Sequence, residues 1–103
     1  MNTEIFTLHW QDYDIQISYS ASKYRAFEKN YGYGMSHIEL QTLKPEGAAL
    51  PITATGYRSI FIPAPQLEEE GGVRALVLGM LDEAAKKREW KDFELQRRQL
   101  TLF

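Results

Sequence analysis

The apolar residues of this chain change their spacing part-way along the sequence, and this change limits the folds that the chain can form. Over residues 3–10 and 13–19, large apolar residues occupy every second position. Over residues 73–84, their spacing becomes i, i+3, i+4, i+7, i+8 and i+11. The first spacing is typical of strands with one buried face, and the second is typical of an amphipathic helix. We therefore expect a sheet that comes first in the chain and a helix that covers it.

Four strands are expected in the first two thirds of the chain. The short polar link Gln11-Asp12 joins the first two runs, so they are predicted to form an antiparallel hairpin. Further strands are expected over 35–43, with Ile38 and Leu40 facing inward, and over 56–63. The last of these carries large apolar residues on both sides, which predicts a central position in the sheet. Residues 23–29 are expected to form either a short helix or an ordered loop.

The last third of the chain is expected to be helical, with one break. Trp90 and Phe93 fall on the opposite side of a continuous helix from the apolar stripe of residues 73–84. One straight helix cannot bury both sets, so a bend is predicted within 86–89. Before this helix, residues 65–70 are expected to form a short turn, and Gly71-Gly72 sets the direction of the helix that follows.

Strands followed by helices, without regular alternation, predict an α+β domain. We expect a single antiparallel sheet of about four strands covered by C-terminal helices, in the order ββ(α)ββ(α)α. With 103 residues the chain holds one core. Residues 1–95 are expected to form this domain, and residues 96–103 a C-terminal tail.

Composition excludes several classes of function. Twelve Lys and Arg residues against 14 Asp and Glu residues give a net charge of −2, which is too small for strong binding to a phosphate backbone. The chain has no cysteine, and its two histidines, His9 and His37, are far apart in sequence, so neither a thiol site, a metal site nor a cofactor is expected. No nucleophile motif or phosphate loop occurs. We expect a cytoplasmic protein that is neither an enzyme nor bound to a membrane.

Residues 50–59 combine small hydroxyl residues, a glycine and an arginine where a strand begins. Thr53, Thr55, Tyr57 and Arg58 are therefore a candidate binding surface for a phosphate or a partner carboxylate. The alternative interpretation is structural: the threonines satisfy backbone groups in a tight turn, and Arg58 pairs with a glutamate on the neighbouring strand.

The aromatic residues of the predicted strands allow a further alternative. Trp10, Tyr13, Tyr19, Tyr57 and Phe61 are of the type that stacks nucleic-acid bases on an open sheet. Core packing is the better interpretation of these residues, because the chain has no surplus of basic residues. Direct binding of nucleic acid is therefore the weaker hypothesis.

The chain ends in Gln99-Leu100-Thr101-Leu102-Phe103. This pentapeptide resembles the motif by which bacterial DNA polymerases and repair proteins bind the replicative sliding clamp. The resemblance implies that Gln99 hydrogen-bonds in a small subsite, that Leu100 covers its edge, and that Leu102 and Phe103 fill a hydrophobic cleft of the clamp.

The chemistry of this chain end has two interpretations. Large apolar groups at a terminus need to be covered, and Arg97-Arg98 before them would steer the tail toward an acidic rim. Alternatively, Leu100 continues the helical face of Trp90 and Phe93, and the last residues fold back into their own core.

Most of the chain also resembles a family of small uncharacterised proteins encoded on bacterial plasmids and other mobile elements. The resemblance rests on the segment Leu-Pro-Ile-Thr-x-Thr-Gly-Tyr-Arg-Ser over 50–59, on Gly71-Gly72, on residues 81–85, on Trp90 and on the terminal Gln-Leu-x-Leu-Phe. In that family a histidine commonly follows this segment, where this chain has Ile60. The favoured hypothesis is an interaction protein that binds the sliding clamp, in replication or repair on mobile DNA. The alternative is a mobile-element inhibitor of a host defence complex, such as CRISPR, that acts through the folded surface.

Overall fold

The computed structural model describes residues 3–21, 32 and 34–100, with side chains as far as position 97. Its elements follow in the order of four strands and then three helices. The strands are β1 (Thr3–Trp10), β2 (Tyr13–Ser20), β3 (Met35–Lys44) and β4 (Tyr57–Pro63). The helices are α2 (Ala64–Glu69), α3 (Val73–Ala85) and α4 (Arg88–Leu100). The expectation for residues 23–29 lies outside the described residues.

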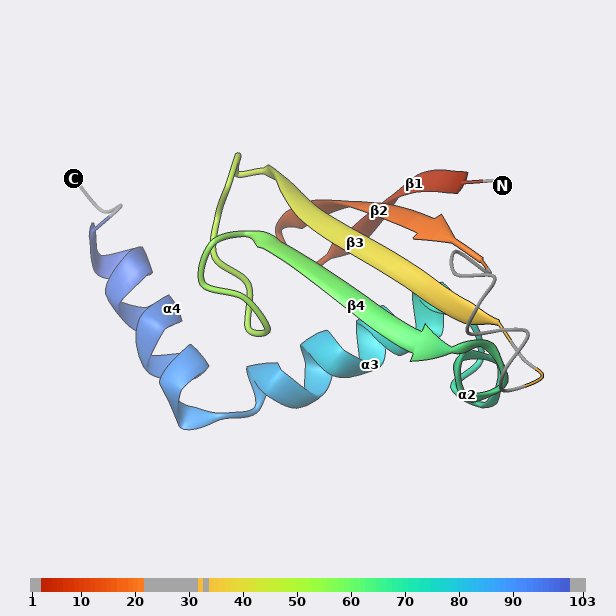
Figure 1. The fold of residues 1–103 in the computed structure, drawn as a ribbon. Helices are drawn as coiled ribbons and strands as arrows, with labels where there is room; N and C mark the ends of the chain where they lie inside the picture. The colour runs from red at the N-terminus through yellow and green to blue at the C-terminus, as the bar shows by residue number, and fades with distance from the viewer. Residues whose placement is uncertain (1–2, 22–31, 33, 101–103) are drawn as a thin grey trace.

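The four strands form one antiparallel sheet in the order β1-β2-β3-β4, with α3 beneath it (Figure 1). The α+β class, the hairpin and the covering helices are confirmed. Phe6 of β1 lies opposite Ile17 of β2, which in turn lies opposite Leu40 of β3. Because paired residues share a face, alternate positions of all four strands contribute to one apolar surface.

The expected central position of β4 is wrong, because β4 is an edge strand. The apolar residues on its two faces have different environments. Ile62 is buried on the helix-covered face, whereas Phe61 points to the open face and stacks on His37 of β3, with ring centroids 4.3 Å apart. Phe61 remains 50% exposed. Apolar residues on both faces therefore reflect what lies above and below a strand, and not what lies beside it.

The helical stripe and its break are confirmed. Val77 and Leu81 of α3 are fully buried against the sheet, and the helix ends at Ala85. A new helix begins at Arg88, and this change of direction buries Trp90. The break allows Trp90 to reach the same core as the α3 stripe, whereas Phe93 stays 40% exposed.

Three aromatic rings close the core beneath the hairpin. Trp10 and Tyr13 of the hairpin stack with their centroids 5.8 Å apart, and Trp90 of α4 lies 6.3 and 6.2 Å from them. The Trp10 indole nitrogen donates a 2.8 Å hydrogen bond to Asp82 of α3. The hairpin is thus joined to both long helices.

No helix within the described part of the chain has the length and apolar character needed to cross a bilayer.

Polar contacts hold α4 against the hairpin. The Tyr13 hydroxyl donates a 2.6 Å hydrogen bond to Glu94, and Arg97 donates to both oxygens of the same carboxylate at 3.3 and 3.0 Å. The Arg97 guanidinium also lies over the Tyr13 ring, 5.6 Å from its centroid. Burial raises the pKa of Tyr13 to about 12, and the hydrogen bond and charge of Glu94 act in the same direction.

The stability of the protein is expected to fall as the pH rises from 10 toward about 12, partly through Tyr13. The folded state keeps the Tyr13 proton in this window, whereas an unfolded tyrosine loses it near its ordinary pKa of 10.0. The stabilisation is complete below pH 10 and is lost above it. Urea denaturation across this window should show a steeper loss for the natural protein than for Tyr13→Phe. Parallel curves for the two proteins would contradict this prediction.

Candidate functional site

The predicted partner-binding residues lie at the C-terminal end of α4. This helix continues to Leu100, so the backbone of Gln99 and Leu100 forms its last turn. The expected boundary after residue 95 falls within the helix. Leu102 and Phe103 lie outside the described residues, as do the side chains of Gln99 and Leu100. Figure 1 shows α4 turning upward at the end of the molecule away from α2.

Arg97 has a different environment from the one expected for a steering group. Its guanidinium is paired with Glu94 and lies over Tyr13. Its charge is therefore largely compensated within its own domain, and it stabilises the position of α4 on the hairpin.

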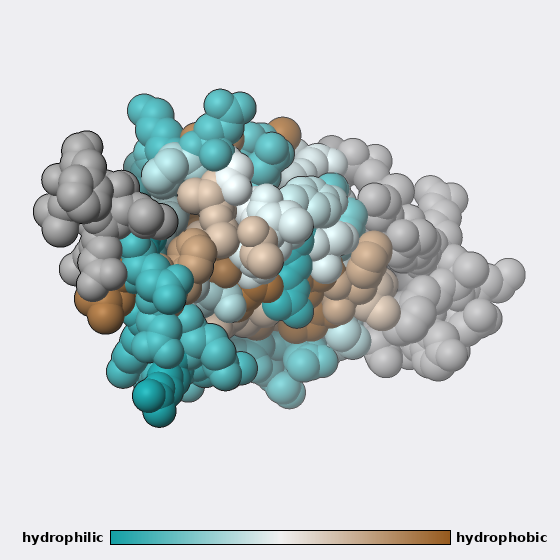
Figure 2. All heavy atoms as spheres, turned by 90° about the vertical axis from the view of Figure 1, so that its left-hand side faces the viewer, coloured by the Kyte–Doolittle hydropathy of each residue, from teal (hydrophilic) through white to brown (hydrophobic). Residues whose placement is uncertain are grey.

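The outer surface near α4 is mixed in character. Figure 2 views the molecule from the side on which α4 lies, and hydrophobic residues there are gathered between strongly hydrophilic surfaces. Phe93 and Leu95 of α4 are 40% and 60% exposed. Phe93 also stacks on Trp90, and both line a groove of about 450 Å³ against the segment 49–54.

The segment 50–59 is organised mainly by its own hydrogen bonds. The Thr53 and Thr55 hydroxyls donate to the carbonyl oxygen of Tyr57 at 2.7 and 3.3 Å. Arg58 donates to the carbonyl oxygen of Ile52 at 3.0 Å, and not to a glutamate of the neighbouring strand as its structural interpretation expected. The threonines thus have the backbone-satisfying role that their structural interpretation predicts.

The four candidate residues of this segment do not converge on one surface. Tyr57 and Arg58 are consecutive in β4, so their side chains point to opposite faces of the sheet. The Tyr57 hydroxyl donates a 2.6 Å hydrogen bond to Glu39 on the open face. Arg58 instead turns back to the loop. Placement on both faces of an edge strand separates the groups that a phosphate or carboxylate site would need together.

Gly56 fixes the loop that precedes β4. Its φ is +77°, and a Cβ atom there would lie 2.8 Å from the carbonyl oxygens of Ala48 and Gly47. Gly47 has a similar φ of +66° but no atom within 4 Å of its Cβ position. Replacement of either glycine by alanine would therefore strain the backbone, because both have a positive φ. Of the two, only an alanine at position 56 would also collide with backbone atoms.

Gly56→Ala is expected to lower the free energy of unfolding by more than Gly47→Ala. The left-handed backbone alone costs a side chain about 1–2 kcal/mol, which is the effect expected for Gly47→Ala. Gly56→Ala adds the displacement of the loop backbone. Urea denaturation of both variants measures the difference. Equal losses would show that the loop moves aside at no cost.

The open face of the sheet carries a polar cluster that the sequence analysis did not identify. His37 Nε2 lies 2.6 Å from Ser59 Oγ, and His37 Nδ1 lies 3.8 Å from a Glu39 oxygen. Glu39 also accepts the Tyr57 hydrogen bond, which raises the pKa of that hydroxyl. His37 and Glu39 are two positions apart on β3, and Tyr57 and Ser59 are two positions apart on β4, so all four side chains lie on the same face. The cluster could be predicted only from the register between these two strands. The contacts cross between strands, and such pairs stabilise a sheet.

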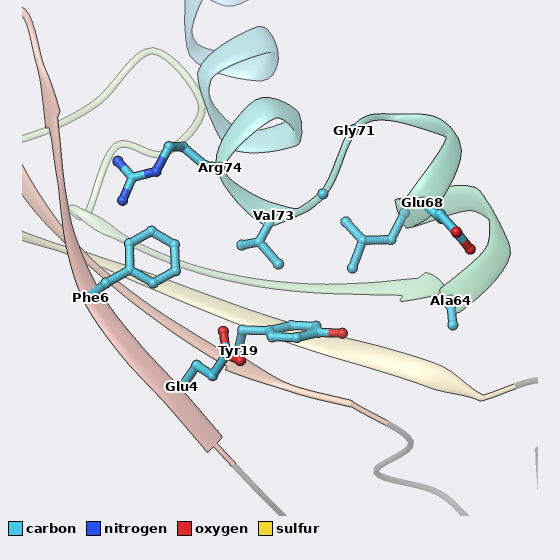
Figure 3. A pocket seen from close by; sticks show the side chains of 10 residues that line it. Glu4, Phe6, Tyr19, Ala64, Glu68, Gly71, Val73 and Arg74 are labelled. Carbon is cyan, nitrogen blue, oxygen red and sulfur yellow. The ribbon is translucent and has the colours of Figure 1, made fainter.

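A second groove, of about 760 Å³, lies beside α2, at the opposite end of the molecule from α4 (Figure 1), and Figure 3 shows it from close by. It is bounded by the first strands, by α2 and by the beginning of α3. Phe6, Tyr19 and Val73 supply apolar and aromatic walls, while Glu4 and Glu68 bring carboxylates to its edge. This groove was also not identified from the sequence, because its walls come from three separate segments.

Comparison with known protein families gives one match, which covers most of the chain. Residues 3–90 match the family described as the KlcB third domain. The chain belongs to this family. Membership fits the resemblance to small plasmid-associated proteins. The KlcB third-domain match covers the sheet, α2 and α3 and ends at Trp90, so most of α4 and the terminal pentapeptide lie beyond it. No curated protein and no solved structure matches the chain.

Proposed function

We propose that this protein is a plasmid-associated interaction protein that binds the bacterial sliding clamp through Gln99, Leu100, Leu102 and Phe103. It acts by binding and not by catalysis, in replication or repair on mobile DNA. The observation that carries this proposal is the terminal sequence Gln-Leu-Thr-Leu-Phe, which begins in the last turn of α4.

The position of the motif supports a role in binding a partner. The first part of α4 is held in place by Trp90, which is buried in the core, and by Glu94, which accepts a hydrogen bond from Tyr13 of the hairpin. The end of the helix lies at one extremity of the molecule. The end of α4 lies away from α2 and from the groove beside it. The last carbonyl groups of a helix have no partner within the helix, so its final turn opens at low cost. Gln99 and Leu100 can therefore adapt to a cleft.

The family match supports a division of roles within the chain. The matched region ends at Trp90, and the proposed motif begins nine residues later. The match covers the sheet, α2 and α3, and the motif lies beyond the matched residues at the end of α4. Binding of the clamp would bring this domain to replicating DNA or occupy the clamp against other proteins.

The proposal is tested by calorimetric titration of purified sliding clamp with the full chain and with a chain that ends at Arg98. The full chain is expected to bind in the micromolar range, because burial of three large side chains is offset by the cost of association and tail ordering. The truncated chain is expected not to bind. Leu95→Ala is the matched control, since it removes an exposed apolar side chain of α4 outside the motif. Equal binding by the full and truncated chains would refute the proposal.

A further inference from the structure

The groove at the α2 end of the molecule has an aromatic floor. Phe6 of β1 and Tyr19 of β2 point from the sheet toward Val73 at the beginning of α3, as Figure 3 shows. Both aromatic side chains are only partly buried, although they pack against the core. Helix α3 begins too late to cover this corner of the sheet. An apolar surface is therefore accessible between the strands and α2.

Acidic groups border this floor on two sides. Glu4 of β1 lies below Tyr19, and Glu68 of α2 lies across the groove (Figure 3). Both residues are exposed, and within the described residues neither forms an ion pair. Glu69 and Glu70 extend the acidic run beside Glu68.

The basic group of the groove already has an aromatic neighbour. The Arg74 guanidinium lies over the Phe6 ring, 4.8 Å from its centroid. The chain thus places one cation on one of the two aromatic rings. Tyr19 lies between Glu4 and Glu68 and offers the second ring to the groove. An aromatic ring near two carboxylates attracts a cation that has an apolar stem.

We propose that this groove binds the arginine or lysine side chain of a peptide segment in a partner protein. The aliphatic stem lies on Tyr19 and Val73, and the cationic head lies between Glu4 and Glu68. Charge complementarity selects a basic occupant, because the two lining carboxylates exceed the single lining guanidinium. This surface is separate from the terminal motif and does not depend on it.

The exposure of the rim favours a peptide segment over a free small molecule. Glu4, Glu68, Gly71 and Arg74 are all exposed, so the groove leaves one side of its occupant in solvent. Small-molecule sites bury most of the ligand surface. A peptide that lies across the groove needs only one side chain to be enclosed.

The proposal is tested with the full chain by recording amide NMR spectra during titration with an acetylated Leu-Arg-Leu amide. The amides of Gly71, Gly72 and Val73 are expected to shift. A peptide with neutral citrulline in place of arginine is expected to bind about fivefold more weakly, which is the upper range for exposed ion pairs. Equal affinity of the two peptides, or shifts confined to other regions, would overturn the proposal. Spermidine that binds as tightly as the arginine peptide would overturn the peptide as the occupant.

Two sets of variants assign the effect to the groove. Glu4→Gln combined with Glu68→Gln is expected to remove the preference for arginine over citrulline, while Glu46→Gln in the distant β3–β4 loop leaves it unchanged. Tyr19→Leu is expected to weaken both peptides, and Tyr19→Phe to restore them. The amide spectra of each variant report whether it is folded. A preference that survives in the folded Glu4 and Glu68 double variant would overturn the assignment.

Discussion

Replacement of Leu102 and Phe103 together by alanine is expected to weaken binding to the sliding clamp by a factor of roughly 10²–10⁴. Each side chain contributes about 1.5–3 kcal/mol when it is buried from water, and every 1.4 kcal/mol changes the affinity tenfold. Both residues lie beyond Leu100, the last residue of α4, and outside the residues that the structure describes. The loss is measured by fluorescence anisotropy with labelled clamp and increasing concentrations of each variant.

A graded set of single variants separates the motif from general hydrophobic adhesion. Gln99→Ala is expected to cost less than Phe103→Ala, because one hydrogen bond contributes about 0.5–1.5 kcal/mol. Unchanged stability of every variant in urea would exclude the alternative in which the last residues fold back into their own core. If the alanine double variant retained the affinity of the natural chain, the terminal motif would have no role in binding.

Leu81→Ala is expected to lower the free energy of unfolding by about 2–5 kcal/mol, the range for truncation of a buried leucine. Leu81 lies on α3 with no exposed surface, so its removal leaves a cavity between α3 and the sheet. This loss is large beside a total stability of about 5–15 kcal/mol for a domain of this size. Urea denaturation monitored by the fluorescence of Trp10 and Trp90 measures it.

Leu95→Ala is the matched control for this experiment, since the same side chain is removed from a helix. Leu95 is 60% exposed on α4, and its replacement is expected to change stability by no more than about 0.5 kcal/mol. Similar losses in the two variants would contradict the assignment of the core to the α3 side of the sheet.

Local periodicity was sufficient to predict which side chains of the hairpin and of α3 are buried. Ile15 and Ile17 face the helices because a strand alternates its side chains, and Val77 and Leu81 share a face because a helix turns every 3.6 residues. The break before Arg88 was predictable for the same reason, since Trp90 could not otherwise reach the core. These features depend on residues near one another in sequence.

The candidate sites were predicted less completely, because they depend on which segments meet. The sequence identified Thr53, Thr55, Tyr57 and Arg58 as one surface, whereas strand geometry directs Tyr57 to Glu39 and leaves Arg58 bonded to Ile52. The role of Gln99, Leu100, Leu102 and Phe103 stays a prediction, and it rests on a contiguous motif that needs no tertiary structure to be recognised.

The sequence by itself determined the order of the elements, the buried faces of β1, β2 and β3, the break between α3 and α4 and the chemical character of the chain end. Only the tertiary structure decided that β4 is an edge strand, that Arg97 is compensated by Glu94 and that Glu4, Tyr19 and Glu68 surround one groove. The physical reason is the range of the interactions. Periodicity follows from the geometry of neighbouring residues, whereas strand order and grooves follow from contacts between segments that lie far apart in the chain.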